Sequence, residues 1–365
     1  MKKFVLCVLI LPCFIQSGFA EGIYEKTAES FDIYAVERGL DEDVLDISGR
    51  LKVDGSYETQ SALSRLWDRL VTELRSRLGK ELAKATELLA IALLCALATA
   101  MTTAKPMQSY ISLAACCAGA ISLLGGLDSL VSDTVSALRQ MLDHSRAAMP
   151  ALYTVAAASG ALSSSAAKYA AVSVGIDIMM EASQKLLVPM IYAYLALSLA
   201  AAVSPYSLLS GIARLLKSLA TTIMTTGTMA FAACLGMTGL VTGSIDAAAL
   251  KAARTVISTA LPVVGRIASD ASAAVLSSAA VIRSSAGAFG LIAVAAMCLG
   301  PFAALSVRML VLKAVSAAAD MVADKRFTGL INSVAAAMGL LLGLLGCCAI
   351  MLFLSITAGI KAVVS

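Results

Sequence analysis

The sequence predicts an all-α, polytopic helical membrane protein, and three observations support this prediction. Hydrophobic residues make up 59% and charged residues only 14% of the 365 positions, whereas about a quarter of an ordinary soluble domain is charged. The central uncharged stretch, 218–243, is long enough to cross a bilayer as a helix, which takes about 20 residues. Moving 112 residues back or forward from it reaches two more uncharged stretches, at 106–127 and 330–355.

The spacing of 112 residues predicts an internal duplication. Two proline pairs, two glycine pairs and one arginine pair share this offset, although none of these residues is common in the chain. The pairs are Pro150 with Pro262, Pro189 with Pro301, Gly175 with Gly287, Gly227 with Gly339, and Arg214 with Arg326. A fixed period of this kind means that one structural unit was built twice. We assign repeat units to about 106–217 and 218–329, followed by a final span at 330–360.

The first 20 residues predict a secretory signal peptide. Lys2 and Lys3 precede a short apolar run, and Gly18-Phe19-Ala20 has the small-x-small pattern of a cleavage site. An uncleaved anchor is the alternative interpretation. Both interpretations place the chain after Ala20 on the outer face of the membrane.

Residues 21–85 form a predicted extracytoplasmic segment that is polar at first and amphipathic later. The segment holds 14 of the 24 Asp and Glu residues. From Leu63 onward, leucines and Trp67 recur at spacings of three and four, which is the period of one helical face. We expect this stripe to pack within the chain and the helix to run on into the membrane. A role for Trp67 as an anchor at the membrane interface is the alternative.

Residues 86–365 form the predicted membrane domain, which contains six spans. The spans are 88–104, 107–127, 186–203, 218–243, 286–307 and 334–360. Lys105-Pro106 predicts a turn after the first span, because proline disfavours helix at the preceding residue. Gly125-Gly126 should end the second span, and 128–148 should follow as a polar amphipathic segment.

Positive charge gives the predicted orientation. With six spans the cytoplasmic loops are Lys105, 214–217 and 308–326, which are richer in lysine and arginine than the long segments placed outside. A repeat of two spans keeps its orientation when duplicated, whereas a repeat of three spans inverts. Seven spans with an inverted repeat therefore remain the alternative.

Two stretches related by the offset, 149–173 and 261–285, are too polar to be predicted as spans. The second contains Arg266 and Asp270, and a charge at the centre of a lipid-facing helix costs about 2.5–3.5 kcal/mol. We expect both stretches to be helices that are buried between other helices, re-entrant or interfacial. Each should be opened by its proline at an N-terminal turn.

The sequence carries no motif of a catalytic, metal or nucleotide site. HExxH, GxSxG and GxxxxGK[ST] are all missing, and the only histidine, His144, is expected in a solvated loop. The seven cysteines beyond the leader lie in uncharged stretches without CxxC spacing, which favours small packing residues over metal or redox chemistry. We expect no enzyme activity, no cofactor, no metal and no nucleic-acid partner.

Ionisable residues close to the membrane are the remaining site candidates. Asp177, Glu181 and Lys185 are spaced by four, so one helical face holds all three. Arg266 and Asp270 have the same spacing in the second unit. Local ion pairing at the membrane interface is one interpretation, and conduction or partner docking is the other.

Several segments are similar to one known family. They are MPALYTVAAASG from Met149, LPVVGRIASDASAAVLSSAAVI at 261–282, and GPFAALSVRMLVLKAVSAAADMVADKRFTGLINSV before the last apolar helix. The most specific piece is Pro262-Val263-Val264-Gly265 with Ser269-Asp270. Together with the leader and the acidic head, these segments resemble the stage III sporulation protein AE family over nearly the whole chain.

The resemblance implies a multi-pass subunit of the channel between mother cell and forespore in endospore-forming bacteria, located in the mother-cell membrane around the forespore. It also implies partners, namely the other stage III A operon proteins, including a secretion-type ATPase and ring-forming subunits, and a forespore-side protein. The residues themselves leave a second hypothesis. This is a self-sufficient secondary transporter with a solute site at the repeat interface.

Overall fold

The computed structural model describes residue 37 and residues 40–49, 57–158, 162–204, 207–260 and 264–361. For 238–284 and a few residues near helix ends it describes the backbone alone. The predicted signal peptide, 1–20, lies outside the described residues, as does most of 21–56. The described residues form helices and short connections, with no strand among them.

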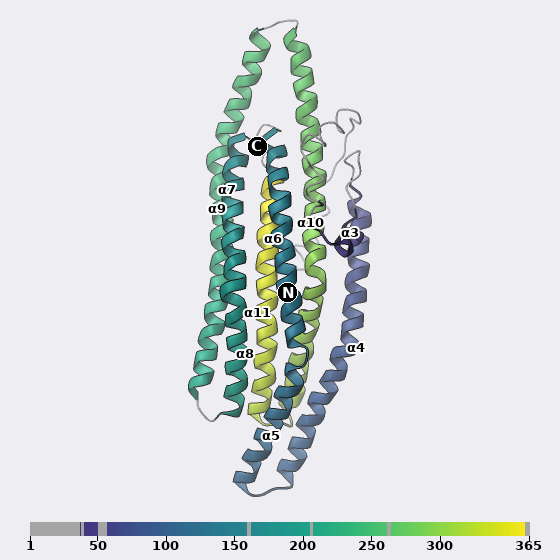
Figure 1. Cartoon of the computed structure of the whole chain (residues 1–365), viewed down its shortest axis with the longest axis vertical. Coiled ribbons are helices and arrows are strands. Elements are labelled where there is room, and N and C mark those ends of the chain that lie inside the picture. Colours follow the sequence, from purple (N-terminus) through teal and green to yellow (C-terminus); the bar gives the residue numbers. More distant parts are fainter. Residues whose placement is uncertain are drawn as a thin grey trace.

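Six long helical segments run along one axis and form an elongated bundle (Figure 1). They are α4 (Thr59–Ala100), α5 (Lys105–Leu124) with α6 (Leu127–Ala158), α7 (Leu162–Ala182) with α8 (Val188–Val203), α9 (Ser207–Ala260), α10 (Val264–Ala319) and α11 (Lys325–Lys361). A short helix, α3 (Glu42–Ser48), packs against α4 and α10. By length and composition, six helices can cross a membrane. Each predicted span overlaps a different one, which confirms the all-α polytopic fold.

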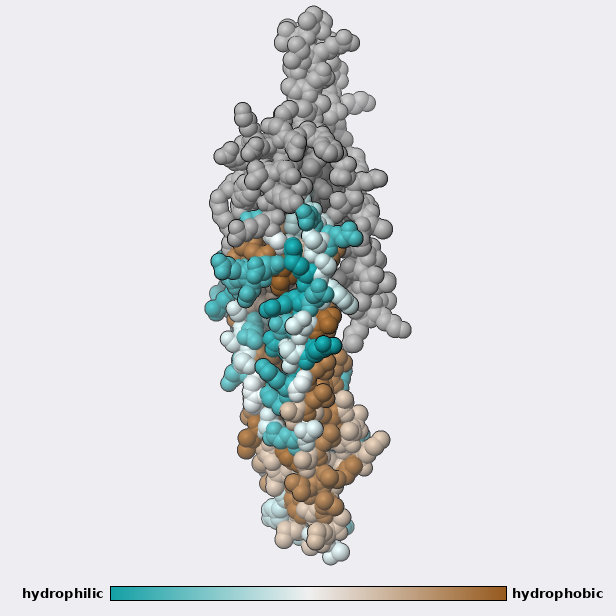
Figure 2. All heavy atoms as spheres, turned by 90° about the vertical axis from the view of Figure 1, so that its right-hand side faces the viewer, coloured by the Kyte–Doolittle hydropathy of each residue, from teal (hydrophilic) through white to brown (hydrophobic). Residues whose placement is uncertain are grey.

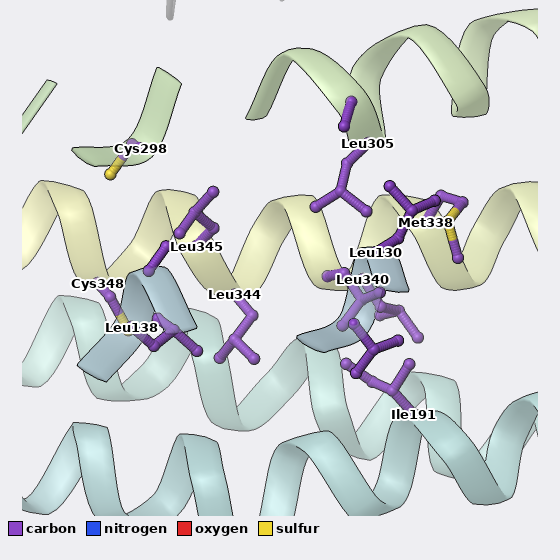
Figure 3. Packing of buried hydrophobic residues seen from close by; sticks show 14 of the residues in the cluster. Leu130, Leu138, Ile191, Cys298, Leu305, Met338, Leu340, Leu344, Leu345 and Cys348 are labelled. Carbon is purple, nitrogen blue, oxygen red and sulfur yellow. The ribbon is translucent and has the colours of Figure 1, made fainter. Parts of the chain in front are cut away.

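The central helix of the bundle is α11, whereas α4 and α9 lie at opposite edges (Figure 1). In the most apolar windows of α10 and α11, 67% and 61% of the residues are buried, against 22% in α4 and 17% in α9. Figure 3 shows Met338, Leu344 and Cys348 of α11 among side chains of α6, α8 and α10. Because lipid is as apolar as leucine, dispersion contacts hold such helices together in a bilayer.

Three connections lie at one end of the bundle, the lower end in Figure 1, where α4 meets α5, α8 meets α9 and α10 meets α11. The predicted turn near Lys105 is present, because α4 ends at Ala100 and α5 begins at Lys105. The predicted break at Gly125-Gly126 is also confirmed. Gly126 has a φ of 81°, a conformation that glycine adopts at no steric cost.

Two predicted cytoplasmic loops are wrong. Residues 214–217 lie inside α9, and 308–319 lie inside α10, which ends in a turn at 320–324. Arg214 and Lys217 are exposed on α9, where a charged side chain leaves the helix intact. Arg308 is buried, and its partners are described below.

The predicted helix start at Pro150 is also wrong, because α6 continues through this proline. Proline inside a helix removes one hydrogen bond and costs about 3 kcal/mol. Here tight packing offsets that cost, since Met149, Leu152 and Tyr153 around it are buried. The expected burial of 149–173 therefore holds for its first half. The related stretch 261–285 lies almost wholly where no side chains are described.

The amphipathic helix predicted after Leu63 is α4, and it runs on without a break as expected. The expected packing of its stripe is wrong, because Trp67 is 64% and Leu82 is 55% exposed. Only part of the stripe, such as Leu74, packs against the core. The predicted boundary between residues 85 and 86 falls inside α4, so the polar head and the apolar body share one continuous helix.

The bundle is much longer than a bilayer is thick. At 1.5 Å per residue, the 54 residues of α9 and the 56 residues of α10 extend about 81 and 84 Å, whereas the hydrocarbon core is about 30 Å thick. On the side of α4, hydrophilic residues cover the upper described part and hydrophobic residues the lower part (Figure 2). The lower part of this edge therefore fits a bilayer, and the upper part fits water.

The helix directions agree with the repeat offset. The offset places α7 and α8 on α10, and α9 on α11, and in each case the two helices run the same way (Figure 1). Pro189 begins α8 just after a π-helical turn at Ser183–Leu187, while its counterpart Pro301 lies inside α10. The duplication itself stays a prediction.

Gly175 tests the packing of α7 against α9. A Cβ added at Gly175 would lie 2.5 Å from Cδ2 of Phe231. We expect Gly175→Ala to lower the free energy of unfolding by about 1–3 kcal/mol, measured as a lower melting temperature in detergent. The control is Gly236→Ala on α9, where the added Cβ meets nothing within 4 Å. Equal stability of the two variants would contradict this packing.

The three connections at one end give a topology test. In a cysteine-free protein, we expect Thr72→Cys on α4 to react with a membrane-impermeant maleimide in intact protoplasts. Thr103→Cys and Val322→Cys, at the opposite end, should react only after permeabilisation. Labelling of Thr103→Cys and Val322→Cys from opposite sides would contradict the bundle, and a protected Thr72→Cys would contradict its orientation.

Candidate functional site

A buried arginine of α10 joins three helices. The Arg308 side chain is 3% exposed, and its Nη1 lies 3.6 Å from Oε1 of Glu81 on α4. Its Nη2 donates to the carbonyl of Leu123 at 2.8 Å and to that of Gly125 at 3.1 Å. One guanidinium group therefore contacts both α4 and the corner between α5 and α6.

The backbone of this corner explains why a cation binds there. The last carbonyls of a helix have no donor within the helix and carry a partial negative charge. Because α5 ends at Leu124, Arg308 meets this charge, and Lys84 adds a hydrogen bond from Nζ to the Gly125 carbonyl at 3.0 Å. A Cβ at Gly126 would lie 3.2 Å from the Lys84 Nζ, so glycine leaves room for the cation.

Removing one partner from such a junction is expensive. A buried charge left without its partner costs about 3–5 kcal/mol. The guanidinium stays charged and has no nucleophile beside it, so this site has no acid, base or covalent chemistry to offer. Its effect is mechanical, because it fixes the position of α4 relative to the body of the bundle.

The predicted site residues do not form one cluster. Asp177 pairs with Arg146 of α6 at 2.9 Å rather than along its own helical face, and the two side chains are 51% and 62% exposed. Lys185 pairs with Glu181 four residues before it, as expected. Exposed pairs of this kind contribute about 1 kcal/mol or less. Beside Arg146 and Asp177 lies a cleft of about 120 Å³, lined also by Tyr169 and Ser173.

Arg266 and Asp270 fall in the first turns of α10. Their side chains lie outside the described residues, so their pairing stays a prediction.

The prediction that His144 lies in a solvated loop is wrong. His144 is fully buried in α6, and within the described part of the chain neither ring nitrogen has a hydrogen-bond partner. Its spacing from Met141 and Ala148, which are also fully buried, places all three on the inward face of the helix.

The cysteines follow the packing prediction in part. Cys95, Cys116, Cys298 and Cys348 are buried, whereas Cys117 and Cys234 are exposed. Among the residues described here, no three His, Cys, Asp or Glu side chains lie close enough to hold a metal ion.

Sequence reasoning missed Arg308 because it ended the fifth span at residue 307 and assigned Arg308 to a loop. A usable pattern is present in the sequence. Arg308 is a single charge between the uncharged stretches 284–307 and 309–312, and a charge that interrupts an apolar helix is a site candidate by default. Its partner Glu81 lies 227 positions earlier, and no local pattern connects the two.

Breaking the junction should have a larger effect than breaking an exposed pair. We expect Arg308→Met to lower the free energy of unfolding by about 3–5 kcal/mol, and Lys185→Met, which breaks the exposed pair with Glu181, by about 1 kcal/mol or less. Thermal unfolding in detergent measures both. Similar losses in the two variants would contradict the assignment of Arg308 as the buried link between the helices.

Comparison with known proteins gives one match. Residues 48–362 match the family model described as stage III sporulation protein AE. No curated protein and no solved structure matches the chain. The matched range covers α4 to α11, including Glu81 and Arg308. Because this match extends over most of its length, the chain belongs to the stage III sporulation protein AE family.

Proposed function

We propose that this protein is a non-enzymatic, multi-pass membrane subunit of a channel or secretion-like apparatus between mother cell and forespore, which endospore development needs after engulfment. Family membership supports the sporulation role, and the six apolar helices support a place in a membrane. We place the protein in the mother-cell membrane that faces the forespore. Its proposed partners are the other stage III A operon proteins, including the ATPase and ring-forming subunits, and a forespore-side protein.

The observation that favours a subunit of an assembly is the length of the bundle. About 30 Å of each helix suffices to cross the hydrocarbon core, but α9 and α10 extend about 81 and 84 Å. In Figure 1 their upper halves rise beyond the other helices. A membrane protein that keeps so much helix outside the bilayer offers a large surface on which other subunits can assemble.

The transporter hypothesis fits the interior of the bundle less well. It requires a solute site where the repeat units meet, near the bilayer midplane. In the described part of the bundle, side chains of α11 fill this region, and Val334, Met338 and Leu341 are fully buried. A packed apolar interface supports a fixed scaffold rather than an alternating solute site.

Genetics and purification test the proposed function. We expect deletion of the gene to stop spore formation after engulfment, and an ectopic wild-type copy to restore it. A tagged copy purified from sporulating cells in mild detergent should carry the ATPase and ring-forming subunits, identified by mass spectrometry. Deletion with normal spore counts would refute the proposal. Solute uptake by the purified protein alone in liposomes would favour the transporter instead.

A further inference from the structure

A cleft of about 190 Å³ lies where α3, α4, α6 and α10 meet. Its rim carries the carboxylates of Asp41, Asp43 and Glu73, and its floor includes Met297 and Pro301. This cleft is separate from the Arg308 junction and from the Arg146–Asp177 pair.

Several contacts hold the acidic rim in place. Arg65 Nε donates to the Ile47 carbonyl at 3.2 Å, and the Tyr57 hydroxyl donates to the Ser48 carbonyl at the other end of α3. The Tyr57 ring packs edge-on against Phe289 of α10 with ring centres 5.6 Å apart. Burial raises the pKa of the Tyr57 hydroxyl against an opposing effect of Arg65, so this group remains a donor.

The floor of the cleft offers an acceptor. Pro301 has no N–H, so the carbonyl of Met297 lacks the donor that a helix normally supplies from four residues onward. Gly300 leaves the adjacent space open, since a Cβ added there would meet nothing within 4 Å. The cleft therefore combines a negative rim with a backbone acceptor and apolar walls.

The charges of the rim are not all engaged. Glu73 pairs with Arg69 at 3.7 Å and with Arg77 at 3.2 Å. Asp41 accepts a hydrogen bond from the Gln140 amide, and Asp43 has no ion-pair partner among the described residues. From Asp41 to Ser48, the described chain has four acidic residues and no basic one. The rim thus keeps a negative field that a cation would offset.

The spacing of these groups favours an organic cation over a metal ion. No three metal-ligating side chains of the described residues lie close together, whereas a metal ion needs its oxygen ligands at about 2.0–2.6 Å. An ammonium or guanidinium group on an aliphatic stem satisfies the carboxylates and the carbonyl with its N–H donors. Its stem packs against the apolar walls.

We propose that this cleft binds a lysine or arginine side chain presented by another polypeptide chain. A single long side chain matches one short cleft with its negative charge at one rim. A free polyamine, whose charges are spaced along its length, would need acidic groups along a whole groove. The proposal goes beyond the proposed function and does not depend on it.

Binding to the full-length protein in nanodiscs tests the proposal, with N-acetyl-arginine amide as the probe in calorimetric titrations. We expect saturable, salt-sensitive binding with a millimolar dissociation constant, and about tenfold weaker binding to Asp43→Asn, since a charge-assisted hydrogen bond is lost. The matched control is Glu42→Gln, which removes a carboxylate of the same helix outside the cleft and should leave the affinity unchanged. Circular dichroism should show equal helix content in both variants.

Two further probes separate the possible ligands. The neutral analogue N-acetyl-citrulline amide should not bind, and spermidine should bind no better than the arginine probe. Equal binding of the citrulline probe, equal loss in Glu42→Gln, or no saturable binding of the arginine probe would each overturn the proposal. Much tighter binding of spermidine would replace the polypeptide side chain by a free polyamine. These readouts do not involve sporulation, so they can fail independently of the proposed function.

Discussion

The constraint on which this structure depends is that a charge inside an apolar bundle must be fully partnered. Arg308 meets this requirement by gathering Glu81 and the carbonyls of Leu123 and Gly125 around one guanidinium. These partners come from two different parts of the bundle, so satisfying the charge also fixes where α4 and the α5–α6 corner lie against α10. Dispersion contacts hold apolar helices together but discriminate weakly between positions along an axis, whereas the directional hydrogen bonds of Arg308 select one position.

This junction connects two parts of the molecule that differ in composition. Below it, α4 and α5 expose apolar side chains that suit lipid, and above it α4 exposes charged ones. Because α4 passes through both regions without a break, any force on the polar head reaches the membrane body along a rigid helix. A subunit that must hold partners outside the bilayer in register with a body inside it needs such a link.

Much of the fold could be predicted from the sequence, because long uncharged stretches and their flanking glycines act locally. The six spans, the corner at Gly125-Gly126 and the continuous amphipathic helix after Leu63 all depend on neighbours in sequence. The errors arise where tertiary packing overrides a local rule. Pro150 stays inside α6 because its neighbours are buried, and His144 is buried because it shares a helical face with Met141. The partnership of Arg308 with Glu81 joins distant segments, so neither hydropathy nor periodicity could predict it. The acidic cleft likewise depends on how four separate helices meet.

An experimental structure of the full chain in lipid nanodiscs tests this account most directly. It should show six helical segments within one bilayer and the Arg308 guanidinium within hydrogen-bonding distance of the α5 carbonyls and beside Glu81. Fewer than six membrane crossings, or Arg308 in a solvent-facing loop, would contradict the account.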